Sequence, residues 1–264
     1  MTYIVALWGI LIRESLRFLS QRERLLSALL RPMLWLVIFA SGFRAALGVA
    51  ITPPYETYIT YEVYILPGLI GMVQLFNGMQ TSLSMVYDRE TGSMRALLVS
   101  PLPRWWLLFC KLLAGALVSL VQVYAFLLAA LAFGVAVPAW GYLAAAPVLL
   151  LTGLMLGAAG LFLSSVIRQL ENFAGVMNFV IFPAFFLSSA LYPLWKIAES
   201  NPLLAELAGW NPFTQAVEAI RFALYLQADW PALAGVAGSL LAFAALAVWG
   251  YDPARGLIRR KVME

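Results

Sequence analysis

Long apolar segments joined by short polar connections dominate this sequence of 264 residues. Hydrophobic residues make up 63% of the chain and charged residues only 11%, whereas charged residues make up about a quarter of a soluble domain. A helix needs about 20 apolar residues to cross a bilayer, so the length suits about six spans with short connections. The sequence therefore predicts an all-α, polytopic membrane protein with a single transmembrane domain over residues 1–264.

The six spans are expected at the longest apolar stretches, which are residues 29–49, 63–86, 105–135, 142–165, 173–192 and 231–250. Residues 193–230 differ, because prolines interrupt them and charged side chains leave no uncharged window as long as a span. We expect short helical pieces there that dip into the membrane without crossing it. Such re-entrant backbone must be covered by protein or by a water-filled cavity.

Residues 3–24 have the pattern of an amphipathic helix. Trp8 and Ile12 recur on one side at helical spacing, and Arg13 and Arg17 recur on another. A helix of this kind lies in the plane of the membrane interface. The alternative is that residues 3–12 simply extend the first span.

The longest charged connection between two apolar segments covers residues 87–104. It contains the acids Asp88 and Glu90 and the arginines Arg89, Arg95 and Arg104. We interpret it as a short helix on the membrane surface that a soluble partner can bind. The alternative is a charge-balanced loop in solvent.

The cations are distributed unevenly over the two sides of the predicted topology. Of the 17 lysines and arginines, only Arg44, Lys196 and Arg221 fall on the side away from the two termini. The positive-inside rule then places both termini and the 87–104 connection in the cytoplasm. The net charge of +4 thus reflects orientation, and no basic patch of a soluble domain indicates a nucleic-acid partner.

Several kinds of chemistry are missing from the sequence. It contains no histidine and one cysteine, Cys110, which excludes internal disulfides and His-based metal or catalytic sites. It contains no G-x-x-x-x-G-K-[ST] phosphate loop and no G-x-S-x-G motif. We expect no catalytic site, no metal site and no cofactor in this chain. The predicted spans also lack acids, which disfavours an ion-coupled transporter.

Polar side chains at helical spacing mark one face of the second predicted span, at Gln74, Asn77, Thr81 and Ser84. They either form interhelical hydrogen bonds or line a substrate path, and the two roles are compatible. We assign Gln74, Asn77 and Thr81 to a candidate path, together with Asn178 and Phe182 of the fifth span. The fourth span carries a small-residue face for close helix packing, at Gly153, Gly157 and Gly160.

Two blocks of residues resemble the membrane subunits of type-2 ABC exporters. The first runs from Leu66-Pro67-Gly68 through Tyr87-Asp88-Arg89-Glu90-Thr91-Gly92-Ser93-Met94 to Leu97-Leu98-Val99-Ser100-Pro101 and Lys111. The second is Asn211-Pro212-Phe213-Thr214 followed by Glu218-Ala219-Ile220-Arg221. Both blocks fall where that family has them, and the resemblance covers most of the chain.

The resemblance implies a permease with six spans that pairs with a second permease copy and sits on ABC ATPase subunits. The connection after the second span would be the coupling helix, formed here by Asp88, Arg89, Glu90, Thr91, Gly92 and Ser93. The N-terminal helix at 3–24 and the re-entrant segment at 193–230 have counterparts in the family. ATP and Mg²⁺ would bind to a separate ATPase chain.

The favoured function is therefore an ATP-driven exporter permease, expected as a homodimer in the bacterial inner membrane with lipids around it. The few neutral path residues and nearby phenylalanines favour an amphipathic or lipid-linked substrate. The alternative is a membrane scaffold or assembly factor without transport activity of its own.

Overall fold

The structure of this chain is a computed structural model that describes residues 2–20, 30–38, 53–91, 102–167 and 169–251. Every regular element in these ranges is an α-helix, so the all-α prediction is confirmed. Besides a helical stretch at residues 30–38, the helices are α1 (Thr2–Ser20), α3 (Tyr61–Glu90), α5 (Arg104–Ala132), α6 (Gly141–Ala144), α7 (Ala146–Val166), α8 (Leu170–Phe186), α9 (Leu194–Ser200), α10 (Pro202–Trp210), α11 (Pro212–Leu224) and α12 (Trp230–Gly250).

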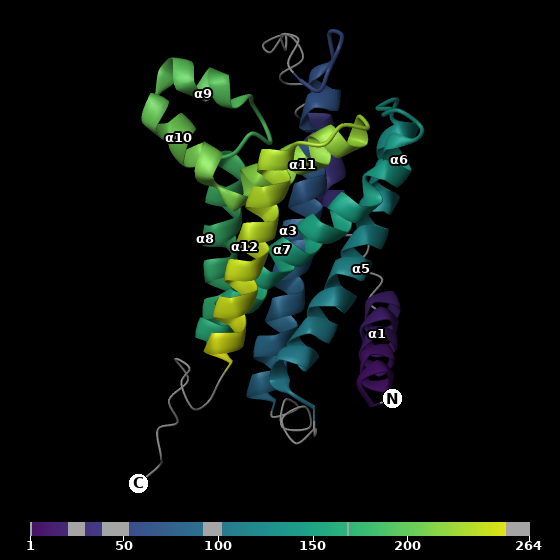
Figure 1. The fold of residues 1–264 in the computed structure, drawn as a ribbon, viewed down its shortest axis with the longest axis vertical. Coiled ribbons are helices and arrows are strands. Elements are labelled where there is room, and N and C mark those ends of the chain that lie inside the picture. Colours follow the sequence, from purple (N-terminus) through teal and green to yellow (C-terminus); the bar gives the residue numbers. More distant parts are fainter. Residues whose placement is uncertain (1, 21–29, 39–52, 92–101, 168, 252–264) are drawn as a thin grey trace.

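Long helices side by side form the body of the protein (Figure 1). Three helical segments among the described residues are long and apolar enough to cross a membrane, namely α5, the combined α6–α7 and α12. The apolar α8 is shorter, with 17 residues, and α3 has 30 residues but carries the polar stripe. The chain is thus a polytopic membrane protein, while the count of six spans stays a prediction.

Helix α7 is the central element, since it packs against α3, α5, α11 and α12. Its glycines let α3 approach closely. A Cβ on Gly78 of α3 would lie 3.0 Å from the Gly157 backbone, and one on Gly160 would lie 2.8 Å from the Gly78 carbonyl oxygen. The predicted small-residue face is therefore confirmed as the contact between these two helices.

The helices α8 and α12 keep large apolar side chains on their outer surfaces. Phe179 and Phe182 of α8 and Leu241 and Trp249 of α12 are all exposed. A membrane protein can cover such side chains with lipid or with another chain. The interior, by contrast, contains fully buried aromatic side chains such as Phe126, Phe173, Phe185 and Phe213.

Helix α1 packs along α5 with only one of its faces. Its Leu7, Ile10 and Leu11 contact the start of α5 around Trp106 and Cys110. The side chains that the sequence pattern grouped on an apolar face point away from the bundle and are exposed, at Trp8, Ile12, Leu16 and Leu19. This leaves an apolar surface for lipid, whereas the position of α1 in the interface plane stays a prediction, and residues 21–24 lie outside the described residues.

Prolines begin the short helices between α8 and α12. Pro202, Pro212 and Pro231 occupy the first turns of α10, α11 and α12, and Pro193 precedes α9. The first turn tolerates proline because its N–H groups have no intrahelical partner. Figure 1 shows α9 and α10 as a bent pair at one side of the upper end, with α11 leading back toward α3. Their re-entrant course through a membrane stays a prediction.

Two helix ends differ from the sequence prediction. Helix α8 ends at Phe186 rather than at 192, because the Ser188 hydroxyl and the Tyr192 phenol both donate to carbonyls of its last turn. Helix α3 continues to Glu90, so residues 87–90 form its last turn and do not begin a separate surface helix. No proline follows Pro67 within α3, and nothing else interrupts its hydrogen bonding before Thr91. Residues 92–101 lie outside the described residues.

Candidate functional site

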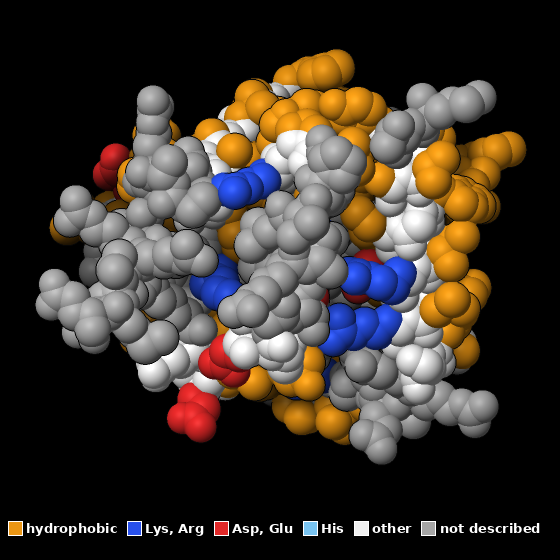
Figure 2. All heavy atoms as spheres, turned by 90° about the horizontal axis from the view of Figure 1, so that it is seen from below, with side chains coloured by type: hydrophobic (Ala, Val, Ile, Leu, Met, Phe, Trp, Pro, Cys, Tyr) orange, Lys and Arg blue, Asp and Glu red, His pale blue; other side chains and the backbone are white. Residues whose placement is uncertain are grey.

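The last turn of α3 carries the first group of functional candidates, the Asp88 cluster, made of Arg17, Asp88, Arg89, Glu90 and Lys111. On the face of the molecule seen in Figure 2, Lys and Arg side chains lie toward the middle, most of the visible acidic side chains lie toward one edge, and hydrophobic side chains lie around much of the rim. Asp88 pairs with Lys111 of α5 at 3.0 Å and lies 4.0 Å from Arg17 of α1. Because the Lys111 side chain is only 3% exposed, it needs this carboxylate as a partner.

Arg89 connects α3 to the C-terminal end of α7. Its guanidinium donates to the carbonyl oxygens of Ser164 at 2.8 Å and Ile167 at 3.4 Å. The last carbonyls of a helix lack intrahelical partners and attract a cation. The same guanidinium lies 5.2 Å from the centre of the Tyr251 ring, just after α12. Burial raises the pKa of the Tyr251 phenol, which shares a 2.8 Å hydrogen bond with the Ser164 hydroxyl.

Glu90 connects α3 to α8. One of its carboxylate oxygens accepts a 2.9 Å hydrogen bond from the N–H of Leu170, the first residue of α8. A carboxylate at this position also suits the positive end of a helix. Asp88, Arg89 and Glu90 thus connect the end of α3 with α1, α5, α7, α8 and the residue after α12. A displacement of this turn would be transmitted to all of them.

The other predicted coupling residues are less constrained. The Thr91 hydroxyl donates to the Tyr87 carbonyl oxygen at 3.0 Å and so completes the end of α3. Gly92 and Ser93 lie outside the described residues. Contact of any of these residues with an ATPase stays a prediction.

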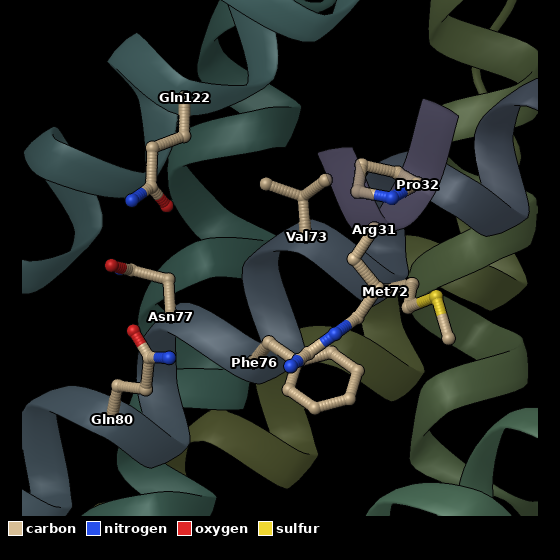
Figure 3. Close-up of a pocket in the computed structure, with 8 residues that line it drawn as sticks. All are labelled: Arg31, Pro32, Met72, Val73, Phe76, Asn77, Gln80 and Gln122. Atoms are coloured by element: carbon tan, nitrogen blue, oxygen red, sulfur yellow. The ribbon is translucent and has the colours of Figure 1, made fainter. Parts of the chain in front are cut away.

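The second candidate is a pocket between residues 30–38, α3 and α5, which we call the amide pocket. It has a volume of about 20 Å³ and is lined by Arg31, Pro32, Met72, Val73, Phe76, Asn77, Gln80 and Gln122. Figure 3 shows the amides of Asn77, Gln80 and Gln122 facing one another along one side. On the other side the Arg31 guanidinium lies 3.9 Å from the centre of the Phe76 ring.

Two amides of this pocket, those of Asn77 and Gln122, are buried but incompletely bonded. Asn77 donates to the Gly115 carbonyl oxygen of α5 at 2.8 Å, which directs its own carbonyl oxygen elsewhere. That oxygen has no hydrogen-bond partner, and neither the nitrogen nor the oxygen of the Gln122 amide has one within the described part of the chain. Asn77 is 3% exposed and Gln122 is 2% exposed. Buried groups of this kind are rare in native proteins and call for an explanation.

The residues predicted to line a substrate path do not come together within one chain. Gln74 donates to the Leu149 carbonyl oxygen at 2.6 Å and accepts a bond from the Thr152 hydroxyl of α7, so its contacts are interhelical. Thr81 lies with Asn77 along a separate cavity of about 10 Å³ near Gly115. Asn178 and Phe182 lie on the exposed side of α8. Whether these residues contact a substrate stays a prediction.

A third group, the Arg221 cluster, lies at the opposite end of α3 from the Asp88 cluster. Arg221 is 2% exposed and donates to the carbonyl oxygens of Tyr64 and Ser189, both at 2.9 Å. Its guanidinium also bonds the Tyr55 hydroxyl at 3.2 Å and pairs with Glu218 at 3.2 Å. Burial raises the pKa of the Tyr55 phenol, which therefore stays neutral. A cavity of about 190 Å³ borders Glu218 and Arg221.

Two of these sites contain residues that the sequence prediction missed. Gln122 lies in an otherwise apolar stretch of α5, and a lone amide in such a stretch was the available signal. Arg221 was placed in the outer segment 193–230 and in the second family block without any contact being assigned to it, although α11 places it among apolar residues such as Val217, Ile220 and Leu224. An arginine on an apolar helix face indicates a buried partner, but the sequence does not identify Tyr64 as that partner.

Residues 5–225 match the model of the ABC-2 type transporter membrane family. This chain therefore belongs to that family and is a membrane subunit of an ABC transporter rather than an enzyme. The family also implies an ABC ATPase as its partner.

Relatives that are named as transport permeases support this assignment. The transport permease ycf38 of Cyanophora paradoxa is 26% identical over 86% of this chain and 77% of its own length. The ycf38 of Porphyra purpurea is 28% identical over 78% of this chain and 69% of its own length. The multidrug ABC transporter permease YbhR of Escherichia coli K12 is 30% identical over 79% of this chain and 55% of its own length.

Proposed function

We propose that this chain is the permease of an ATP-driven exporter that works with a separate ATPase subunit. The observation that carries the proposal is the last turn of α3, where three consecutive side chains contact α1, α5, α7 and α8. An ATPase that binds ATP and Mg²⁺ and moves this turn would act on the whole bundle. The uneven distribution of cations supports a cytoplasmic location for this turn and for both termini, in the inner membrane of a bacterium.

The exporter would contain two copies of this chain within the membrane. Asn178 is exposed on α8 among apolar side chains, and an amide within a span should face protein or water rather than lipid. A second copy packed against α8 would cover Asn178 and would bring Phe182 of both chains to the same interface. Lipids would cover the remaining apolar surface.

The substrate would be amphipathic or lipid-linked. Neutral amides and aromatic side chains on α3 and α8 support this class, because they offer hydrogen bonds beside apolar surface. The name of the relative YbhR refers to multidrug transport, which also fits amphipathic molecules.

The test is Glu90→Arg in the complex of this chain with its ATPase, reconstituted into liposomes. The substitution reverses the charge beside the first N–H of α8, and we expect at least a tenfold loss of ATP-dependent transport while the ATPase remains bound. Glu171→Arg is the matched control, because Glu171 is an exposed acid in the first turn of α8, the helix whose first N–H Glu90 contacts. Equal transport in the Glu90 variant and the control would contradict the coupling role.

The same reconstitution separates the exporter from a membrane scaffold. A complex that hydrolyses ATP but moves none of the amphipathic molecules tested against it would favour the scaffold. Crosslinking of a cysteine introduced at Asn178 tests whether two copies pack against each other through α8. Failure to form a symmetric dimer would contradict the proposed pairing.

A further inference from the structure

The amide pocket lies midway along α3. Arg31 at its mouth is thus far from both ends of that helix, although the sequence topology counted Arg31 among the cytoplasmic cations. Phe76, which packs against Arg31, lies about 22 Å from Tyr61 and about 21 Å from Glu90 along the helix axis. No acid pairs with Arg31 among the residues that the structure describes, and Arg31 is exposed at the mouth of the pocket. An ionisable side chain at such a depth marks a functional site.

The buried part of the pocket fits one hydroxyl group. Its volume of about 20 Å³ exceeds the roughly 10 to 15 Å³ that a water-sized group requires. The Asn77 oxygen and the Gln122 oxygen can each accept a hydrogen bond, and the Gln122 nitrogen can donate one. A hydroxyl can both donate and accept, so it satisfies groups that would otherwise cost about 1 to 3 kcal/mol each.

The mouth of the pocket combines a cation with apolar surface. The Arg31 guanidinium can bind a phosphate through two parallel hydrogen bonds. On the same helical stretch, Leu34, Val37 and Ile38 are exposed and apolar, and Met72 and Val73 line the pocket beside Arg31. The site thus suits a molecule that has a phosphate for the mouth, a hydroxyl for the interior and a hydrocarbon chain for the apolar surface outside. A phospholipid with a hydroxylated head group has all three.

We propose that the amide pocket binds the head group of an anionic lipid that carries a hydroxyl group next to its phosphate, with Arg31 on the phosphate and the Asn77 and Gln122 amides on the hydroxyl. A lipid that merely surrounds the protein keeps its head group at the membrane surface. A head group halfway along α3 instead belongs to a lipid in transit, so the inference rests on the proposed export function and names its substrate class.

Binding to the purified complex of permease and ATPase tests the proposal, measured by native mass spectrometry with three lipids. Phosphatidylglycerol carries the anion and hydroxyls, phosphatidylmethanol carries the anion alone, and phosphatidylcholine carries neither a net charge nor a hydroxyl. We expect phosphatidylglycerol to bind about tenfold more tightly than phosphatidylmethanol, and phosphatidylcholine to bind weakest. Equal binding of all three would overturn the proposal.

Two variants assign the contacts. Arg31→Gln should weaken both anionic lipids about tenfold, and Gln122→Leu should remove only the preference for phosphatidylglycerol. The matched controls are Arg13→Gln, an exposed arginine of α1, and Ser119→Ala, which removes another buried, unpartnered group of α5 outside the pocket. If Gln122→Leu changed the melting temperature but left lipid preference intact, the pocket would hold only a water molecule and the proposal would be wrong.

Further arms distinguish the possible sources of the ligand. Glycerol 3-phosphate has the head-group chemistry without the hydrocarbon, and displacement of the lipid by this compound at equal concentration would overturn the assignment to a lipid. ATP and Mg²⁺ should lower lipid occupancy if the lipid is cargo, and unchanged occupancy during hydrolysis would contradict transit. If no ATPase binds but lipid selectivity persists, the proposed export function fails while the lipid site stands.

Discussion

Two arginines hold the opposite ends of α3, and they do so in different ways. Arg221 is buried, pairs with Glu218 and also bonds the Tyr64 and Ser189 backbone. Arg89 is partly exposed and is bonded to carbonyl oxygens at the end of α7. Both arginines join segments far apart in the sequence, but only Arg221 would leave a buried charge behind if its contacts broke.

This difference indicates at which end of α3 the contacts can break and form again. Breaking a buried ion pair is costly because its partner remains without water, whereas water can replace the partners of an exposed group. The Arg221 cluster should therefore hold α11 and the start of α3 together throughout the cycle. Within the Asp88 cluster the buried Lys111 keeps its pair with Asp88, whereas water can replace the partners of Arg89 and Glu90. An applied displacement would therefore be accommodated at the contacts of these two side chains with α7 and α8.

Removing the arginine of the tighter cluster should have the largest effect. Arg221→Met leaves Glu218 unpaired and the Tyr64 carbonyl without its donor, so we expect a loss of about 3 to 5 kcal/mol in unfolding free energy. Thermal unfolding of the purified protein in detergent measures this loss of unfolding free energy. A melting temperature within the error of the wild type would show that the cluster does not stabilise the fold.

Asp88→Asn should have the second largest effect, a loss of about 2 to 3 kcal/mol in unfolding free energy. The reason is that it leaves the buried Lys111 ammonium without its carboxylate. The double variant Asp88→Asn with Lys111→Met should recover most of this loss. The same unfolding measurement on the four proteins of the double-mutant cycle gives the coupling energy. Strictly additive losses would mean that the two side chains do not interact.

Arg89→Gln should cost only about 1 kcal/mol, since water reaches the carbonyl oxygens that it releases. Its effect on ATP-dependent transport should be much larger than its effect on stability. Comparing the transport rate with the unfolding midpoint in the same preparation checks this separation. A fall in stability as large as that of Arg221→Met would remove the distinction between the two ends.

The smallest effect is expected from an exposed pair near the Arg221 end. Lys196 and Glu199 of α9 lie 2.7 Å apart, but both side chains are more than half exposed. Lys196→Gln should therefore change the unfolding free energy by less than about 0.5 kcal/mol. A larger change would mean that the burial of a contact does not predict its contribution to stability, and that its position in the fold matters more.

Sequence patterns predicted the helices well where local chemistry determines their ends. Pro202, Pro212 and Pro231 mark the starts of α10, α11 and α12, because proline is tolerated there and not further inside. The end of α3 was misplaced because the change from apolar to charged residues was taken as a break. A change of polarity moves a helix out of the membrane without ending it.

The sites were harder to predict, because they depend on contacts over long sequence separations. Gln74, Asn77 and Thr81 share a helix face, yet Gln74 bonds to α7 while Asn77 borders α5 and the pocket. Only the packing of three helices decides which polar side chain receives a partner. The unsatisfied Gln122 and the buried Arg221 are consequences of that packing, so no local pattern specifies them.

The close crossing of α3 and α7 at Gly78 and Gly157 also fixes a point about which α3 can turn. Gly78 lies about 18 Å from Glu90 and about 26 Å from Tyr61 along the axis. If α3 turns there as a rigid rod, a shift of about 1 Å at Glu90 becomes an opposite shift of about 1.4 Å at Tyr61. The placement of these glycines nearer one end therefore amplifies and reverses an applied movement.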